Sequence, residues 1–79
     1  MSQTPTAQLD AKGLSCPLPV VKARLELEKL GAGDVLEVVA TDPGSVADFD
    51  SFAKMTGHEL LTSSEQDGVF TYLIRKNGS

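Results

Sequence analysis

Cysteine and histidine are scarce in this chain of 79 residues, which contains one of each, Cys16 and His58. A single cysteine cannot form an internal disulfide, a Cys-x-x-Cys redox pair or a multi-cysteine zinc site. A thiol-peroxidase role is also disfavoured, because no second cysteine can resolve an oxidised one. A metal site would need both residues and carboxylates to converge from distant segments. The sequence therefore predicts neither a metal nor a cofactor, and it favours a surface or boundary position for His58.

Long hydrophobic runs and an excess of basic residues are absent as well. No segment is long and apolar enough to cross a membrane, and the N-terminus has no signal-peptide core. Lysine and arginine number 7 against 11 acidic residues, so the net charge is −4, and the basic residues are dispersed. Nucleic-acid binders usually present a basic face, so direct nucleic-acid binding is disfavoured. These features predict a cytoplasmic protein, in a reducing compartment that suits a free thiol.

The length fits one domain with a thin core, since a chain of this size buries only about 60% of the surface that it exposes when unfolded. We expect residues 1–6, which are polar and contain Pro5, to form a flexible tail. Residues 7–79 then make up a single domain. Any chemistry must take place on its surface or in a shallow groove.

The hydrophobic pattern predicts six elements in the order β-α-β-α-β-β. Strands are expected over residues 7–12, 35–41, 58–65 and 69–76, with helices over residues 17–30 and 45–56. Asp67-Gly68 between the last two strands predicts a type I′ hairpin turn. The first β-α-β unit should be parallel and right-handed, and the hairpin must be antiparallel. The fold class is therefore an α/β (α+β) two-layer sandwich, a four-stranded mixed sheet with two helices on one face.

Each helix shows an apolar face at helical spacing, which we expect to pack on the sheet. In the first helix this face consists of Val20, Ala23, Leu27 and Leu30, and in the second of Val46, Phe49, Phe52 and Ala53. Val21 and Leu25 form a separate strip on the first helix, which either packs against the second helix or binds a partner. The strand at 35–41 is almost entirely apolar, which indicates an interior strand covered on most of both faces.

Cys16 lies where a turn opens into the first helix, in the segment Cys16-Pro17-Leu18-Pro19. With Cys16 at the N-cap, Pro17 occupies the first helical position, which proline favours. The amides of Leu18 and Val20 could then point at the sulfur and, with the helix dipole, favour the thiolate. An accessible thiolate without helpers can accept a sulfane sulfur as a persulfide and yield it to another thiol. The alternative is that Cys16 is a small buried apolar residue.

The segment at residues 13–19 resembles the Cys-Pro-x-Pro signature of the TusA/SirA-type sulfur carrier family. The resemblance extends over nearly the whole chain. Residues 9–14 and 33–38 resemble the first two strands of that family, and Thr41-Asp42-Pro43 matches the step before its second helix. Residues 57–60 and 72–76 resemble the entry to its third strand and its closing strand.

This resemblance implies a β-α-β-α-β-β sandwich and a sulfurtransferase-type carrier that holds sulfur as a persulfide on Cys16. It implies a donor protein, either a cysteine desulfurase or a rhodanese-like protein, and a downstream sulfur-relay acceptor. The pathways implied are tRNA 2-thiouridine synthesis, sulfur oxidation and molybdenum-cofactor synthesis. Some tRNA-pathway members carry a basic residue before the cysteine, where this chain has Ser15.

Partner contacts are expected around the Cys16 end of the first helix. The candidate contact residues are Val21, Lys22, Arg24 and Leu25, beside the motif residues Pro17, Leu18, Pro19 and Val20. A competing hypothesis is a regulatory or RNA-interacting α/β module in which Cys16 is structural. The dispersed basic residues count against that hypothesis.

Overall fold

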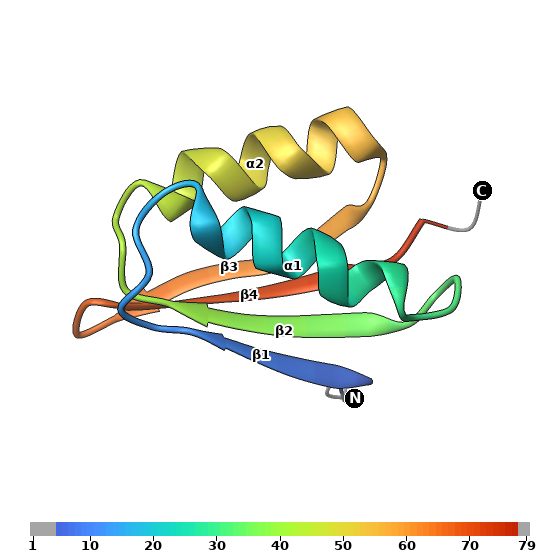
Figure 1. The fold of residues 1–79 in the computed structure, drawn as a ribbon, viewed down its shortest axis with the longest axis horizontal. Coiled ribbons are helices and arrows are strands. Elements are labelled where there is room, and N and C mark those ends of the chain that lie inside the picture. The colour runs from blue at the N-terminus through green and yellow to red at the C-terminus, as the bar shows by residue number, and fades with distance from the viewer. Residues whose placement is uncertain (1–4, 78–79) are drawn as a thin grey trace.

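The computed structural model describes residues 5–77, which form six elements in the predicted order (Figure 1). The strands are β1 (Ala7–Ala11), β2 (Val35–Ala40), β3 (Glu59–Gln66) and β4 (Val69–Arg75), and the helices are α1 (Leu18–Glu28) and α2 (Ser45–Thr56). Most of the tail predicted at residues 1–6 lies outside the described residues. Within it, Thr6 is already tied to the sheet, because its N–H donates to the Val35 carbonyl at 2.7 Å.

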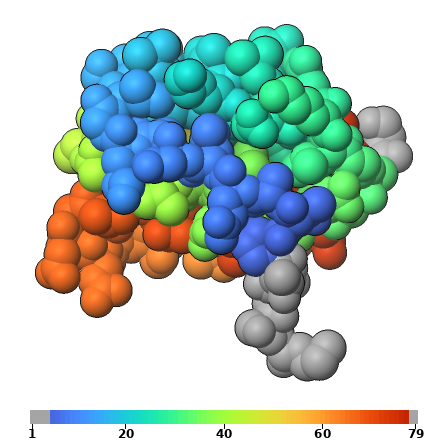
Figure 2. Space-filling model, turned by 60° about the horizontal axis from the view of Figure 1, so that its bottom comes forward, coloured from blue at the N-terminus to red at the C-terminus, as the bar shows by residue number. Residues whose placement is uncertain are grey.

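The four strands form one mixed sheet in the order β1-β2-β4-β3. β1 and β2 are parallel, whereas β4 pairs antiparallel with β2 and with β3. Figure 1 shows both helices on the same face of this sheet, so the predicted fold class is confirmed. Figure 2 shows β1, in dark blue, along the free edge of the sheet beside α1, and the β3–β4 hairpin, in orange, standing out from the body.

The core lies between the sheet and the two helices. Its strand residues alternate along the chain, as strands with one covered face require. They are Ala11, Leu36, Val38, Ala40, Tyr72 and Ile74, and the helices add Ala23, Leu27, Phe49 and Phe52. The expectation that β2 is covered on most of both faces is wrong. β2 is a central strand, but both helices lie on one face of it. On the face without a helix, Val35 is buried at one end of the strand, while Glu37 and Val39 are only half-buried.

The buried face of α1 is displaced slightly from the predicted one. Ala23 and Leu27 are buried as expected, but Pro19 is buried in place of Val20, which is half-buried at the edge of the core. The helix ends at Glu28, so Leu30 lies beyond it and packs against the core from the following turn.

α2 begins with a buried polar residue that the hydrophobic pattern missed. Ser45 is 1% exposed, while Val46, predicted to face the core, is 44% exposed. Ser45, Phe49 and Phe52 share one face because they lie four and three residues apart. Burial of Ser45 is tolerated because its hydroxyl bonds the hydroxyl of Tyr72 at 2.7 Å.

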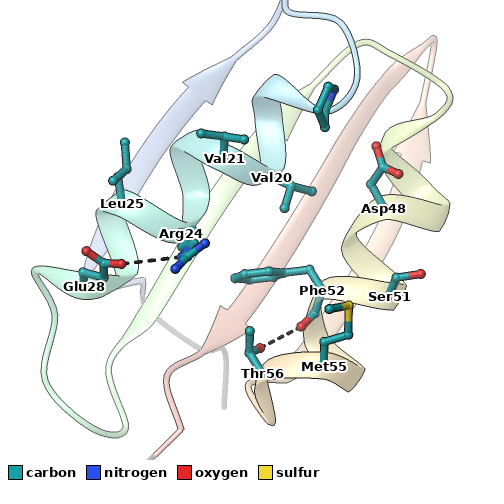
Figure 3. Close-up of a pocket in the computed structure, with 11 residues that line it drawn as sticks. Val20, Val21, Arg24, Leu25, Glu28, Asp48, Ser51, Phe52, Met55 and Thr56 are labelled. Atoms are coloured by element: carbon teal, nitrogen blue, oxygen red, sulfur yellow. Dashed lines mark hydrogen bonds and ion pairs between the residues drawn. The ribbon is translucent and has the colours of Figure 1, made fainter.

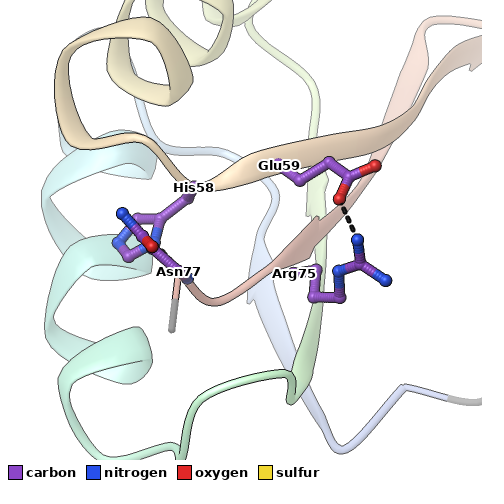
Figure 4. Close-up of polar contacts among 4 residues, drawn as sticks. All are labelled: His58, Glu59, Arg75 and Asn77. Carbon is purple, nitrogen blue, oxygen red and sulfur yellow. Dashed lines mark hydrogen bonds and ion pairs between the residues drawn. The ribbon is translucent and has the colours of Figure 1, made fainter. Parts of the chain in front are cut away.

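The hairpin between β3 and β4 has the predicted turn. Asp67 and Gly68 both have positive φ, 54° and 81°, as a type I′ turn requires. At the other end of the hairpin, Arg75 on β4 forms an ion pair with Glu59 on β3 (Figure 4). No helix within residues 5–77 is long and apolar enough to span a membrane.

Candidate functional site

The site forms where the first two strands end. Because β1 and β2 are parallel neighbours, the loops that follow them leave the same edge of the sheet. Two hydrogen bonds join these loops. The Gly13 N–H donates to Thr41 Oγ1 at 2.9 Å, and the Cys16 N–H donates to Asp42 Oδ2 at 2.6 Å. The β2–α2 loop thus fixes the backbone that carries the cysteine.

The start of α1 differs from the predicted start. Pro17, not Cys16, is the N-cap residue, so Cys16 lies one position outside the helix, and the Cys16–Pro17 peptide bond is cis. The Leu18 N–H donates to the Ser15 carbonyl at 2.9 Å. The sequence predicted that this amide points at the sulfur, but it is already bonded to Ser15. The local motif therefore does not by itself explain the environment of the thiol.

The thiol of Cys16 is exposed and donates a hydrogen bond to Oδ2 of Asp48, in the first turn of α2. This hydrogen bond is the main reason that the pKa of Cys16 lies above its ordinary value. Partial loss of hydration and the negative charges of Asp48 and Asp42 raise the pKa further. The expectation that the helix start favours the thiolate is therefore wrong for the isolated protein.

The position of Asp48 is set by the anchoring of α2 on the sheet. Ser45, one turn before Asp48, bonds the buried hydroxyl of Tyr72 on β4. The ring of Tyr72 stacks on Phe49, with ring centroids 4.4 Å apart. A polar pair and an aromatic pair thus hold the N-terminal end of α2 in one place, and this end presents the Asp48 carboxylate to the thiol.

A groove of about 560 Å³ runs between α1 and α2 and begins beside the Cys16–Pro17 turn (Figure 3). In Figure 3, Asp48 lies near the N-terminal end of both helices, and Arg24, Leu25 and Glu28 lie farther along α1. The lining is largely apolar and accessible, since Val21, Leu25 and Met55 are 46%, 53% and 85% exposed. Exposed apolar side chains from both helices thus gather along this groove.

The structure brings most of the candidate contact residues together. Val21, Arg24 and Leu25 line the groove, whereas Lys22 is exposed on α1 but outside it. Val21 and Leu25 thus flank the groove and do not bury themselves against α2. Of the motif residues, Pro17 and Val20 line the groove, Leu18 is 45% exposed and Pro19 is buried.

His58 lies away from the cysteine. It follows the C-terminal end of α2, whereas Asp48 lies in the first turn of that helix. Nδ1 of His58 accepts a hydrogen bond from the Asn77 N–H at 2.9 Å (Figure 4). Partial burial and the charge of Lys76 lower the pKa of His58. Among residues 5–77, no group of three or more His, Cys, Asp and Glu side chains could hold a metal ion.

Neither Asp42 nor Asp48 was among the site residues predicted from the sequence, although Asp42 belongs to the Thr41-Asp42-Pro43 step. The signal that could have found them is the parallel pairing of the first two strands, because the loops after parallel neighbours meet at one edge of the sheet. Asp42 follows β2 directly, and Asp48 lies in the first turn of the next helix. Which of the acidic residues in this region reaches Cys16 depends on the depth and rotation of α2, which local sequence does not specify.

Comparison with known proteins shows which family this chain resembles. Residues 7–76 match the family described as Sulfurtransferase TusA. The chain is 56% identical over 70 residues to the sulfur carrier protein TusA of Allochromatium vinosum, covering 89% of this chain and 92% of that protein. It is 48% identical over 73 residues to the sulfur carrier protein TusA of Pseudomonas putida strain GB-1, covering 92% of this chain and 91% of that protein.

A solved structure is similar to this chain in fold and in sequence. The crystal structure of a SirA-like protein from Desulfitobacterium hafniense superposes with a TM-score of 0.81 at 31% identity, covering 91% of this chain and 99% of that one. The match of the family over residues 7–76 spans every strand and helix of the sandwich. The chain therefore belongs to the TusA sulfurtransferase family.

Proposed function

We propose that this protein is a cytoplasmic sulfur carrier that accepts sulfane sulfur as a persulfide on Cys16 and passes it to a thiol of an acceptor protein. The observation that supports this most directly is the exposed thiol of the chain's single cysteine, beside the groove between α1 and α2. Membership of the TusA family and the names of the relatives, sulfur carrier protein TusA, agree with this role. The exposure of Cys16 also counts against the alternative in which the cysteine is a buried structural residue of a regulatory or RNA-interacting module.

Loading and unloading are two exchanges of the same kind. The Cys16 sulfur attacks the outer sulfur of a persulfide on the donor, and the donor's S–S bond breaks with its electron pair moving to the donor cysteine. The Cys16 proton ends on the donor thiolate, so a persulfide and a thiol yield a thiol and a persulfide. Unloading repeats the exchange with an acceptor thiol as nucleophile and Cys16 as leaving group. Neither exchange needs an external oxidant or reductant.

The donor class that we propose is a cysteine desulfurase or a rhodanese-like protein, and the acceptor is a sulfur-relay protein. The acceptor pathway is tRNA 2-thiouridine synthesis, sulfur oxidation or molybdenum-cofactor synthesis. Ser15 provides no positive charge before Cys16, which weakens the case for the first of these. The docking surface that we propose is the groove, through Val21, Arg24 and Leu25, with Lys22 contributing charge from outside it.

The test is intact mass spectrometry of the protein after incubation with a cysteine desulfurase and cysteine, with and without a reductant. The wild type should gain one sulfur atom, and the gain should disappear on reduction. Cys16→Ala should gain none and stay folded, because the side chain is exposed. Ser15→Ala is the matched control, an exposed neighbour that should load like the wild type.

Two results would contradict the proposal. One is loading of Cys16→Ala at another residue. The other is failure of the wild type to load from both the desulfurase and a rhodanese supplied with thiosulfate. Circular dichroism of each variant verifies that a loss of loading reflects the missing thiol and not an unfolded chain.

A further inference from the structure

Among residues 5–77, the charged groups that shift the pKa of Cys16 are acidic. They are Asp48, in the first turn of α2, and Asp42, in the β2–α2 loop. The first turn of α1, Leu18 to Val21, carries no charged side chain, and Ser15 precedes the cysteine. Reactive cysteines usually lie in electropositive surroundings that stabilise the thiolate. The surroundings of Cys16 have the opposite sign, which calls for an explanation in a protein whose cysteine has to react.

This acidic environment acts oppositely on the two states of a carrier. The empty carrier holds a neutral thiol that donates a hydrogen bond to Asp48, so Asp48 stabilises it. A persulfide is a stronger acid than the thiol from which it forms, so the loaded carrier is largely an anion at neutral pH. An anion beside Asp48 and Asp42 is repelled by both carboxylates and loses the hydrogen bond that the thiol donated.

We propose that Asp48 sets a low affinity of Cys16 for sulfur by stabilising the empty thiol and destabilising the loaded persulfide anion. This inference rests on the proposed carrier function and concerns how tightly that carrier holds its sulfur. The equilibrium concerned is the exchange in which a carrier persulfide and a free thiol yield a carrier thiol and a free persulfide. Asp48 shifts this equilibrium toward the free persulfide, with no atom or electron added.

The geometry keeps Asp48 in place for this role. Its helix is fixed through Ser45, which bonds the buried Tyr72 hydroxyl at 2.7 Å. The cysteine backbone is fixed separately, because Asp42 Oδ2 accepts its N–H at 2.6 Å while Oδ1 accepts the Gly44 N–H at 3.3 Å. Tertiary contacts therefore restrain both the helix that carries Asp48 and the backbone of Cys16, so the fold itself keeps the carboxylate next to the thiol.

The functional consequence is a carrier that transfers sulfur and does not store it. At neutral pH the empty thiol is mostly protonated, since its pKa is raised mainly by the bond to Asp48, and it therefore reacts slowly with electrophiles that meet it in solution. Once loaded, it yields sulfur to an acceptor thiol without having to overcome a strong preference for the persulfide.

The first experiment measures the rate of Cys16 alkylation by iodoacetamide against pH in the wild type, Asp48→Asn and Asp50→Asn. Asp50 lies on the same helix and pairs with Lys54 at 3.0 Å, so its variant removes the same charge away from the thiol. In Asp48→Asn the midpoint should move to lower pH, and the rate at pH 7 should rise at least about fivefold. Removing one unit charge at about 4 Å in water has that effect alone, and the neutral amide is also a weaker acceptor of the thiol's hydrogen bond. Asp50→Asn should have the same alkylation rate as the wild type at each pH.

The second experiment measures sulfur partition. Each protein is loaded chemically with inorganic polysulfide, equilibrated anaerobically with glutathione and glutathione persulfide at fixed ratios, and quantified by intact mass spectrometry. In Asp48→Asn the partition constant should move at least about fivefold toward the loaded carrier, because the repulsion of the persulfide anion is removed and the empty thiol is hydrogen-bonded more weakly. The partition constants of the wild type and Asp50→Asn should be equal.

A partition constant that is the same in all three proteins would overturn the inference, as would an alkylation profile that Asp48→Asn leaves unchanged. Because the persulfide is installed chemically, neither result depends on a protein donor. Failure of the proposed function would appear elsewhere, as a wild type that no donor protein loads. Asparagine has nearly the shape of aspartate, and circular dichroism verifies that the Asp48→Asn fold is intact.

Discussion

At the scale of single residues, the environment of Cys16 shows which of two electrostatic effects is larger. A helix N-terminus acts like about half a positive charge spread over its first turn. Asp48 brings a full negative charge into hydrogen-bond contact with the sulfur, and Asp42 adds a second from the neighbouring loop. The carboxylates therefore outweigh the dipole, and the pKa of the thiol is raised. The sequence motif predicted a helix that begins just after Cys16, but not the sign of the charge around the thiol.

Ser45 and Tyr72 provide a residue-scale prediction about how α2 is held. Each hydroxyl is the buried partner of the other. Ser45→Ala or Tyr72→Phe alone should lower the free energy of unfolding by about 1–3 kcal/mol, because the remaining hydroxyl loses its bond without gaining water. The double variant Ser45→Ala/Tyr72→Phe should lose less than the sum of the two single variants. Urea unfolding gives the free energy of unfolding of the wild type, the two single variants and the double variant. If the losses in the single variants add up to the loss in the double variant, the two hydroxyls do not stabilise each other.

At the scale of secondary-structure elements, periodicity predicted all six elements but not each buried face. Ser45 and Val46 both precede Phe49 at helical spacing, and the apolar residue looked like the better core candidate. Ser45 is buried instead because Tyr72 supplies a hydrogen-bond partner from β4. The start of α1 was predicted one residue early for a related reason. Asp42, 26 residues away, holds the Cys16 backbone in the loop, and such a contact leaves no trace in the local pattern.

Two glycines at element ends provide an element-scale prediction. Gly68 in the hairpin and Gly57 at the end of α2 both have a φ of +81°. Alanine at either position should destabilise the fold by about 1 kcal/mol, since a side chain disfavours this backbone conformation. A Cβ at Gly68 meets nothing within 4 Å, whereas one at Gly57 would lie 2.6 Å from Asn77 Nδ2.

Gly57→Ala should therefore lose more stability than Gly68→Ala, because Asn77 must shift in addition. Chemical denaturation of the two variants beside the wild type measures the difference directly. Equal losses would mean that the Asn77 side chain moves aside freely and that backbone conformation alone sets the stability at both positions.

At the scale of the whole molecule, the site lies where separate parts of the fold converge. The loop after β1 brings Cys16, the loop after β2 brings Asp42, and α2 brings Asp48. The groove between the helices begins at the same point. The sequence predicted the fold class because alternation and turn residues are local signals. The acidic neighbours and the groove depend on how α1 and α2 pack side by side, which only the assembled sandwich determines.

The groove provides a prediction at this scale, on the docking of a sulfur donor. Leu25 is 53% exposed and lines the groove, so Leu25→Gln should remove apolar contact with a docked donor. The donor concentration for half-maximal loading should rise about fivefold, corresponding to about 1 kcal/mol of lost binding. Because this contact is apolar, the effect should change little with salt. Unchanged loading kinetics in Leu25→Gln, followed by mass spectrometry, would remove the groove from the docking surface.

Substitution of Lys22, which lies outside the groove, tests whether charge steers the sulfur donor toward the protein. Lys22→Glu should slow loading at low salt and approach the wild-type rate at about 1 M salt, where the screening length falls to about 3 Å. Lys29→Glu makes the same change in net charge at the far end of α1, where Lys29 contacts Glu26 at 3.3 Å. If both variants slow loading equally, the overall charge of the protein governs the encounter. A loss confined to Lys22→Glu assigns the steering to the end of α1 that carries Cys16.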